Sequence, residues 1–298
     1  MPSHARHAGG GPLALVLETK AEGFVVRRPA GAALSAGPIE WLREIVERRD
    51  LLLMLAWREI KLKYKQSVMG FMWAILMPGL IITAGVLVKY VFASLSGTPL
   101  DNADVVSVAV RSVPWAFVVA SIRFGSMSLV SNSNLVTKIY MPRVIFPLAS
   151  VLSQLVDLSV ASAVLTVLLL FTGGYFGVEL LWLPILLLVT IVLVSGIVLF
   201  ASAASLILRD VKYIVEVVIT FAIFFTPVFY DVSMFNKWET VLLLNPLAPL
   251  LEGINAAVHG RPMPYGIWVL YSTVVAVLTL IGGLAFFKRL EPYFAESA

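Results

Sequence analysis

Six stretches of the chain carry almost continuous apolar residues and are separated by short polar segments. A helix that crosses the hydrocarbon core of a bilayer needs about 20 mostly apolar residues. By that measure we predict spans over residues 68–95, 114–130, 145–171, 180–208, 213–230 and 265–287. The second stretch is the weakest, because Arg123, Gly125 and several serines dilute it. The pattern therefore predicts an all-α integral membrane protein with six transmembrane helices.

Two other stretches have a mixed pattern. Residues 39–49 place their apolar positions on one helical face and their charges on the other, which is typical of an amphipathic helix in the headgroup layer. Residues 241–258 are apolar but are broken by Asn245, Pro246 and Pro249. We interpret them as short helices or a re-entrant element between spans five and six, because proline interrupts a helix.

These patterns divide the chain into four parts. Residues 1–37 are rich in Gly, Ala and Pro and predict a mobile cytoplasmic arm. Residues 38–67 form an amphipathic interfacial or cytoplasmic segment, residues 68–290 form the six-helix transmembrane domain, and residues 291–298 form a cytoplasmic tail.

Composition supports the membrane class. Of 298 residues, 59% are hydrophobic and 13% are charged, whereas a soluble domain has about 45–50% apolar and about 25% charged residues. The chain has no cysteine. Disulfides, a thiol nucleophile and a thiolate metal site are therefore excluded.

The positions of Lys and Arg orient the spans. Seventeen of the 22 lie in the segment before span one, in the loops after spans two and four, and in the tail. The loops on the other side hold only Lys237 and Arg261. Because positive charge stays in the cytoplasm, both termini are predicted to be cytoplasmic. The formal net charge of +4 is then a topology signal and does not indicate a nucleic-acid partner.

Motifs for catalysis are missing. The chain has no G-x-x-x-x-G-K-[ST] loop for ATP, and its three histidines are isolated, so we expect neither an enzyme active site nor a metal site. Four charged residues fall within the predicted spans: Lys89 near the end of span one, and the three predicted intramembrane polar residues Arg123, Asp157 and Glu216. Such groups either pair between helices or line a hydrophilic path, and both interpretations stay open.

Several motifs resemble one family. Residues 64–74 read YKQSVMGFMWA, with Pro78 soon after, and are similar to the YKxSxLGxxWxxxxP stretch of polysaccharide-exporting ABC permeases. Residues 132–148 read NSNLVTKIYMPRVIFPL and resemble the NxxLVxKxYFPRxxxPL loop of that family. Further matches are LRDV at 208–211, TPVFY at 226–230, LNPL at 244–247 and EG at 252–253. The matches follow the family order, although Met69 and Met141 replace its usual Leu and Phe.

The resemblance implies the membrane subunit of a type 2 ABC exporter in the bacterial cytoplasmic membrane. Such a subunit pairs with a second copy of itself and with two separate ATPase chains, which carry ATP and Mg²⁺, so that this chain needs no cofactor. The implied substrate is a lipid-linked glycan of the O-antigen or teichoic-acid type. An ABC exporter of drugs or small lipids and an ion-coupled transporter remain alternatives.

The resemblance also implies roles for particular residues. The loop at 134–143 looks like the coupling helix that inserts into the ATPase, although an ordinary positive-inside loop has the same charges. The implied ATPase-coupling residues are Asn134, Leu135, Lys138, Tyr140, Pro142 and Arg143, flanked by Arg58, Lys61, Lys63, Arg209 and Asp210.

Aromatic residues of spans one and five form a second candidate set. A polymer that slides needs many weak contacts, and sugar C–H faces stack weakly on aromatic rings. Lipid-facing or packing roles are the alternative for such residues. The predicted glycan-pathway residues are Phe71, Trp73, Tyr90, Phe92, Phe221, Phe224, Phe225, Phe229 and Tyr230.

Overall fold

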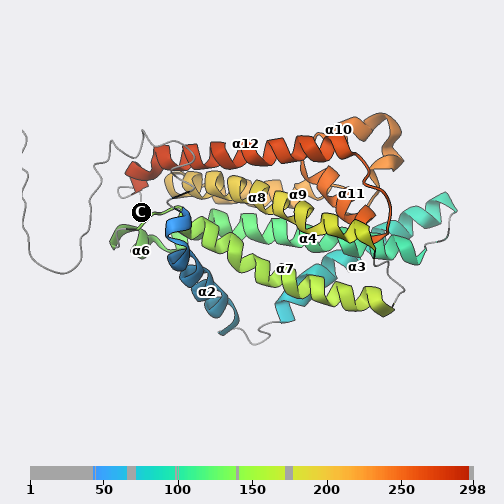
Figure 1. Cartoon of the computed structure of the whole chain (residues 1–298), viewed down its shortest axis with the longest axis horizontal. Helices are drawn as coiled ribbons and strands as arrows, with labels where there is room; N and C mark the ends of the chain where they lie inside the picture. The colour runs from blue at the N-terminus through green and yellow to red at the C-terminus, as the bar shows by residue number, and fades with distance from the viewer. Residues whose placement is uncertain are drawn as a thin grey trace, which may run out of the picture.

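The chain folds as a bundle of long helices that run side by side (Figure 1). The computed structural model describes residues 43, 45–65, 72–97, 99, 101–138, 141–171 and 177–294. Within these residues every regular element is helical, which confirms the predicted all-α class. The long helices are α3 (Trp73–Ser96), α4 (Asn102–Ser126), α7 (Ile145–Phe171), α8 (Trp182–Ile207) and α12 (Gly266–Leu290). In the described part of the chain these five segments, α8 together with the short helix before it, are long and apolar enough to cross a membrane.

Shorter helices gather at the two ends of the bundle. One end, here named the basic end, holds α2 (Arg49–Lys65), α5 (Ser128–Ser131), α6 (Ser133–Lys138) and η5 (Glu291–Tyr293). The opposite end, here named the far end, holds η3 (Val178–Leu181), η4 (Val232–Trp238), α10 (Glu239–Leu243) and α11 (Leu247–Val258). Helix α9 (Val211–Ala222) follows α8. The predicted arm at 1–37, residues 38–42, and the tail from 295 lie outside the described residues.

Helix α4 begins earlier than the hydropathy pattern predicted. The predicted start at residue 114 is wrong, because the helix begins at Asn102. The Asp101 carboxylate accepts a hydrogen bond from the Asn102 amide, and the Asp104 carboxylate accepts one from the Asp101 amide at 3.3 Å. This capping box satisfies amides that the first turn of a helix leaves free. The first half of α4 contains Asp104, Ser107, Arg111 and Ser112 among apolar residues, and from Ser107 onward these polar groups are buried by other helices.

Helix α9 is shorter than the span predicted at 213–230. It ends at Ala222, and residues 223–230 form turns instead. Pro227 has no N–H and disfavours helical geometry at Thr226, which accounts for the stop. The Asn245 side-chain amide donates to the Phe225 carbonyl at 3.1 Å and to the Thr226 hydroxyl at 2.9 Å. The short helices predicted around Asn245 are present as α10 and α11.

Helices α8 and α12 pack closely against each other. A Cβ added to Gly196 would lie 2.5 Å from the Thr279 carbonyl carbon, and one added to Gly283 would overlap the Gly196 oxygen. Small residues let helix backbones approach in this way. These two glycines therefore fix the spacing of α8 and α12.

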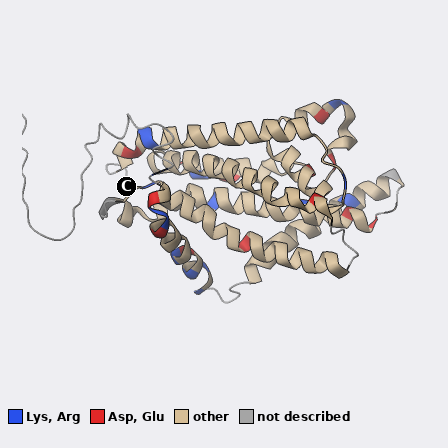
Figure 2. Cartoon of the chain, viewed as in Figure 1, with Lys and Arg blue, Asp and Glu red and all other residues tan. Residues whose placement is uncertain are grey.

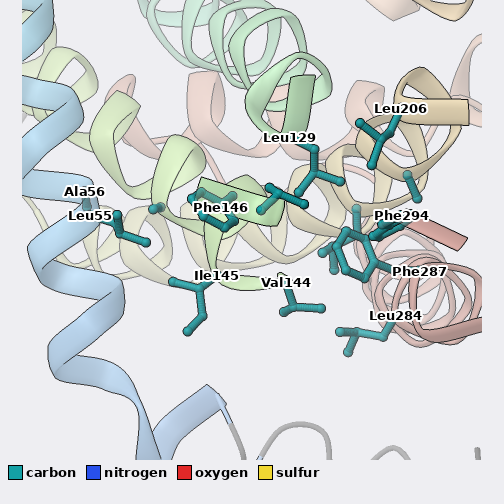
Figure 3. Close-up of a cluster of buried hydrophobic side chains, with 14 residues drawn as sticks. Leu55, Ala56, Leu129, Val144, Ile145, Phe146, Leu206, Leu284, Phe287 and Phe294 are labelled. Atoms are coloured by element: carbon teal, nitrogen blue, oxygen red, sulfur yellow. The ribbon is translucent and has the colours of Figure 1, made fainter. Parts of the chain in front are cut away.

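The basic end has its own apolar core (Figure 3). Leu55 of α2, Phe146 of α7, Leu206 of α8 and Phe287 of α12 are all buried there, together with Phe294 beyond the end of α12. The Phe287 and Phe294 rings meet edge to face, with centroids 5.1 Å apart. This core holds α2 and the segment between α5 and α7 against the bundle.

Candidate functional site

Helix α2 is joined to α7 by polar contacts as well as by the apolar core. The Lys63 ammonium donates to the Gln154 side chain at 3.0 Å and forms an ion pair with Asp157. The Tyr64 hydroxyl donates to the other Asp157 carboxylate oxygen. Asp157 was predicted to need either a partner or a hydrophilic path, and here it has two partners from α2. This arrangement ties a helix outside the spans to the middle of a span.

A carboxylate of α2, Glu59, also lies at the contact with α7. The Ser153 hydroxyl donates to Glu59 at 3.4 Å, and Arg58 stands beside Glu59 in sequence. Burial raises the pKa of Glu59 to about 7, and the hydrogen bond and the Arg58 charge only partly oppose it. Burial and the neighbouring Asp157 also hold the pKa of Tyr64 above its usual value. The stability of the contact between α2 and α7 therefore depends on whether the Glu59 carboxyl is protonated.

A cavity of about 330 Å³ lies beside these groups. Its wall is mostly apolar and comes from α3, α4 and α7, including Trp73, Pro78 and Phe117. Lys63 and Asp157 line the same cavity, and so does Arg123. The structure thus brings together two of the three predicted intramembrane polar residues and one predicted aromatic residue.

Arg123 of α4 is bound to Glu216 of α9. Its Nε donates to Oε1 at 2.8 Å and its Nη2 donates to Oε2 at 2.9 Å. A bidentate pair of this kind fixes orientation as well as charge. Of the two alternatives that the sequence left open, pairing between helices therefore occurs at Arg123, which also lines the mostly apolar cavity.

The predicted coupling segment is anchored on two sides. The Arg58 guanidinium of α2 donates to the Asn132 side chain at 3.0 Å. The Arg143 guanidinium donates to the Glu291 carbonyl at 2.6 Å and lies 5.9 Å from the Phe294 ring centroid. Arg143 thus binds the end of the chain's own last helix, a partner that its sequence did not predict.

The other predicted coupling residues are distributed over the basic end. Asn134, Lys61, Arg209 and Asp210 are exposed, whereas Leu135 packs against the apolar core and Pro142 is half-buried. The Lys61 ammonium lies 5.4 Å from the Trp57 ring centroid. Tyr140 and the side chain of Lys138 lie outside the described residues.

The predicted glycan-pathway residues divide into two groups. Most of the described ones are exposed on the surface of this single chain, namely Trp73, Tyr90, Phe92, Phe221, Phe224 and Phe225. The other two are half-buried: Phe229 packs against Gly85 of α3, and the Tyr230 ring meets the Phe235 ring edge to face. Phe71 lies outside the described residues. Because α9 ends at Ala222, its helical face does not continue to Phe229.

A cluster of five charges at the far end was missed from the sequence. Arg111 of α4 has 0% exposure, binds Glu252 at 2.9 Å and also pairs with Asp231. Lys89 of α3 pairs with Asp104 at 2.7 Å and with Asp231 at 3.3 Å. Figure 2 shows both signs of charge at this end, whereas α2 carries many Lys and Arg. We name these five residues the far-end charge cluster.

The two carboxylates bound by Arg111 respond differently to their surroundings, since burial raises the pKa of Glu252. Burial alone would raise the pKa of Asp231, but Arg111 and Lys89 outweigh it and hold that pKa below the usual value. The second Glu252 oxygen accepts the Val232 amide at 3.1 Å. The signal that could have revealed the cluster is the set of lone charges within apolar stretches, since buried charges need partners.

These features define a multi-pass α-helical membrane protein whose basic end carries an anchored polar loop between two spans. The chain belongs to the ABC-2 type transporter family, to which its residues 50–258 match. It is similar to the O-antigen export system permease protein RfbA of Myxococcus xanthus, at 25% identity over 87% of this chain and 99% of that protein. Two proteins of the same name from Klebsiella pneumoniae are 24% and 26% identical over 83% of this chain and 94% of their own lengths.

Proposed function

We propose that this chain is the membrane subunit of an ATP-driven exporter that moves a lipid-linked polysaccharide to the outer side of the bacterial cytoplasmic membrane. The observation that carries the proposal is the similarity to O-antigen permeases, which extends over most of this chain and nearly the whole of each relative. The chain itself is a transporter subunit of the ABC-2 type. ATP and Mg²⁺ would be bound by two separate ATPase chains, and a second copy of this chain would complete the conduit.

The basic end is the surface proposed for the ATPase. Its many Lys and Arg support a cytoplasmic position, and both termini would then be cytoplasmic. The segment at 134–143 would enter the ATPase, flanked by Arg58, Lys61, Arg209 and Asp210. Because Arg58 and Arg143 fix the ends of this segment to α2 and to the end of α12, movement of the ATPase would reach the spans.

The 330 Å³ cavity is the place proposed for the lipid carrier. Its apolar wall suits a hydrocarbon chain, and Lys63 and Arg123 suit an anionic phosphate. Both cations already bind carboxylates, so the phosphate would have to compete with Asp157 and Glu216. This competition would make binding reversible, as export requires.

The exposed aromatic residues are the proposed contacts of the moving glycan. Trp73→Ala and Phe225→Ala should each slow export severalfold, because each removes one of many weak stacking contacts. Val178→Ala, which truncates an exposed apolar residue at the far end, is the matched control. Normal export by both aromatic variants, with normal assembly, would refute this part of the proposal.

The deciding experiment is reconstitution of the chain with its ATPase in proteoliposomes. Lipid-linked glycan from the same cells should raise ATP turnover, and it should be moved across the membrane only when ATP is present. Transport driven by an ion gradient without ATP would favour an ion-coupled transporter. Stimulation by small lipids or drugs, but not by the glycan, would favour the other type of ABC exporter.

A further inference from the structure

A second cavity lies at the far end of the bundle, beside the far-end charge cluster. Its volume is about 530 Å³, within the range of about 300–1,000 Å³ that is typical of small-molecule sites. It lies between the start of α4, helix α11 and the segment that leads into α12. The polar residues of its lining include Asp104, Asp231, Glu252, Asn255 and Arg261.

Asn255 has an unused acceptor at this cavity. The side chain is 4% exposed, and its Oδ1 has no hydrogen-bond partner among the described residues. A buried polar atom without a partner costs about 1–3 kcal/mol. Because Asn255 lines the cavity, a molecule bound there could supply the missing donor.

The charges around the cavity favour a neutral ligand. Lys89 and Arg111 pair with the carboxylates of Asp104, Asp231 and Glu252, and Arg261 adds a third positive charge, so the charges around the cavity balance and leave little attraction for a cation. In the described part of the chain, no three acidic or histidine side chains are grouped so as to hold a metal ion. An anion would meet only Arg261 as an additional cation. Hydroxyl groups, which both donate and accept, match this mixture of carboxylate, amide and guanidinium groups.

One wall of the cavity is held rigidly. Tyr265 adopts a left-handed backbone conformation with φ 57°, which is costly for a residue other than glycine. The Glu239 side chain lies close to its hydroxyl, and Pro262 and Pro264 precede it in the same wall. A fixed aromatic ring gives the C–H face of a sugar a surface on which to rest. A preorganised wall also lowers the entropic cost of binding.

We propose that the far-end cavity binds a sugar unit of the exported glycan, with Asn255 accepting a hydrogen bond from one sugar hydroxyl and Arg261 donating to another. This inference rests on the proposed function, because it assumes that a glycan reaches this end of the protein. A sugar held here would occupy the far end while the next unit advances, so that the polymer would slip back less easily.

The test uses the absence of native cysteine in the chain. Ser233→Cys places a thiol at the cavity, and Thr240→Cys places one on exposed α10 outside the cavity lining. Each variant is assembled with the ATPase in nanodiscs and treated with a charged thiol reagent. The probe is the oligosaccharide released by mild acid from the glycan of the same cells. It should slow labelling of Ser233→Cys and leave Thr240→Cys unchanged.

Further variants identify the residues that hold the sugar. In the Ser233→Cys background, Asn255→Leu and Arg261→Gln should each raise the half-protecting concentration about tenfold, the loss expected for one hydrogen bond of this strength. Arg261 is exposed, so its variant should fold even if the Asn255 variant does not. Lys237→Gln, an exposed residue outside the cavity lining, is the control and should leave protection unchanged.

Three results would overturn the inference: no protection at Ser233→Cys, equal protection at Thr240→Cys, or equal protection by dextran at the same sugar concentration. Export is measured on the same preparations. Failure of export with protection intact would refute the proposed function but leave the cavity as a sugar site. Export without protection would refute only the inference.

Discussion

Arginine residues of α4 show how strongly the surroundings of a charge determine its role. Arg111 and Arg123 lie three helical turns apart, and each binds carboxylates from a distant part of the chain. Arg111 has 0% exposure and holds two carboxylates, whereas Arg123 and Glu216 are both partly exposed. Loss of Arg111 would leave Asp231 and Glu252 without their main counter-charge. The stability of the far end should therefore depend on Arg111.

Arg111→Gln should therefore destabilise the protein severely. Removing one partner of a buried ion pair costs roughly 3–5 kcal/mol. The melting temperature of the purified chain in detergent measures this effect. Arg43→Gln is the control, because Arg43 and Glu47 form a pair with side chains 79% and 62% exposed. Similar melting temperatures for the two variants would contradict the assigned role of the far-end charge cluster.

Glu59 should make stability depend on pH. Its folded pKa of about 7 lies above the model-compound value of 4.5, so the folded chain retains a proton that the unfolded chain has lost. The stabilisation from this proton is complete below pH 4.5 and is lost as the pH rises through 7. The melting temperature should accordingly fall between pH 5 and pH 8, and Glu59→Gln should flatten this decrease.

The matched control for Glu59 is Glu47→Gln, which changes an exposed carboxyl before α2. It should keep the slope of the unmodified protein. An unchanged slope in Glu59→Gln would show that the carboxyl is ionised in the docked α2 helix.

Helices α8 and α12 pack through faces that their sequences do not reveal. Both are apolar almost throughout, so hydrophobic pattern alone does not distinguish the face that packs from the face that meets lipid. The two glycines decide it, because at Gly196 and Gly283 the backbones come into direct contact. Their pairing sets the position of α12, and therefore of η5 and Phe294 at the basic end.

Gly283→Ala should push α8 and α12 apart. Overpacking a closely packed contact costs about 1–3 kcal/mol. The neighbouring Gly282 has open space around its hypothetical Cβ, so Gly282→Ala should be neutral or slightly stabilising through helix propensity. Thermal unfolding of both variants in the same detergent makes the comparison. A destabilised Gly282→Ala with a normal Gly283→Ala would reverse our assignment of the contact face.

The helices that face lipid were predictable, and those surrounded by protein were less so. Residues 145–171 were predicted as a span and are helix α7, because their apolar side chains suit a hydrocarbon environment. The start of α4 was not predicted, since Arg111 and its neighbouring serines are polar and buried by protein. Hydropathy reports affinity for lipid, and a buried arginine with neighbouring serines lowers it locally although the helix continues through them.

The candidate sites were predictable to a similar extent. Asp157 was identified because a charge within an apolar span is costly, but its partner Lys63 lies 94 residues earlier in the chain. The Arg111–Glu252 pair spans 141 residues. Such pairings depend on tertiary packing, and no local pattern in the sequence encodes them.

The whole molecule links the proposed ATPase surface to the spans through two anchors. Arg58 binds Asn132 at one end of the loop, and Arg143 binds η5 at the other. Helix α2 is in turn fixed to α7 by Lys63 and Tyr64. A force on the loop would therefore act on α7 and α12 together.

Arg58→Gln should weaken the coupling between ATP turnover and export severalfold while the chain still assembles. Asn132→Leu removes the same hydrogen bond from the other side. If Arg58 acts by positioning the loop, the double variant should be no worse than either single variant. Arg48→Gln is an exposed control on the N-terminal side of α2. Additive losses would mean that Arg58 contacts the ATPase directly.

The long separation between Arg111 and its carboxylates also affects how the protein is made. Asp231 and Glu252 follow Arg111 by 120 and 141 residues. At a synthesis rate of about 5–20 residues per second, Glu252 is added about 7–28 s after Arg111. During that interval Arg111 lacks both carboxylate partners. An arginine costs roughly 2.5–3.5 kcal/mol at the centre of a bilayer, which is the upper limit for Arg111. A chain that stops after α8 would leave Arg111 without Asp231 and Glu252, so we expect it to be less stable in the membrane than the full chain.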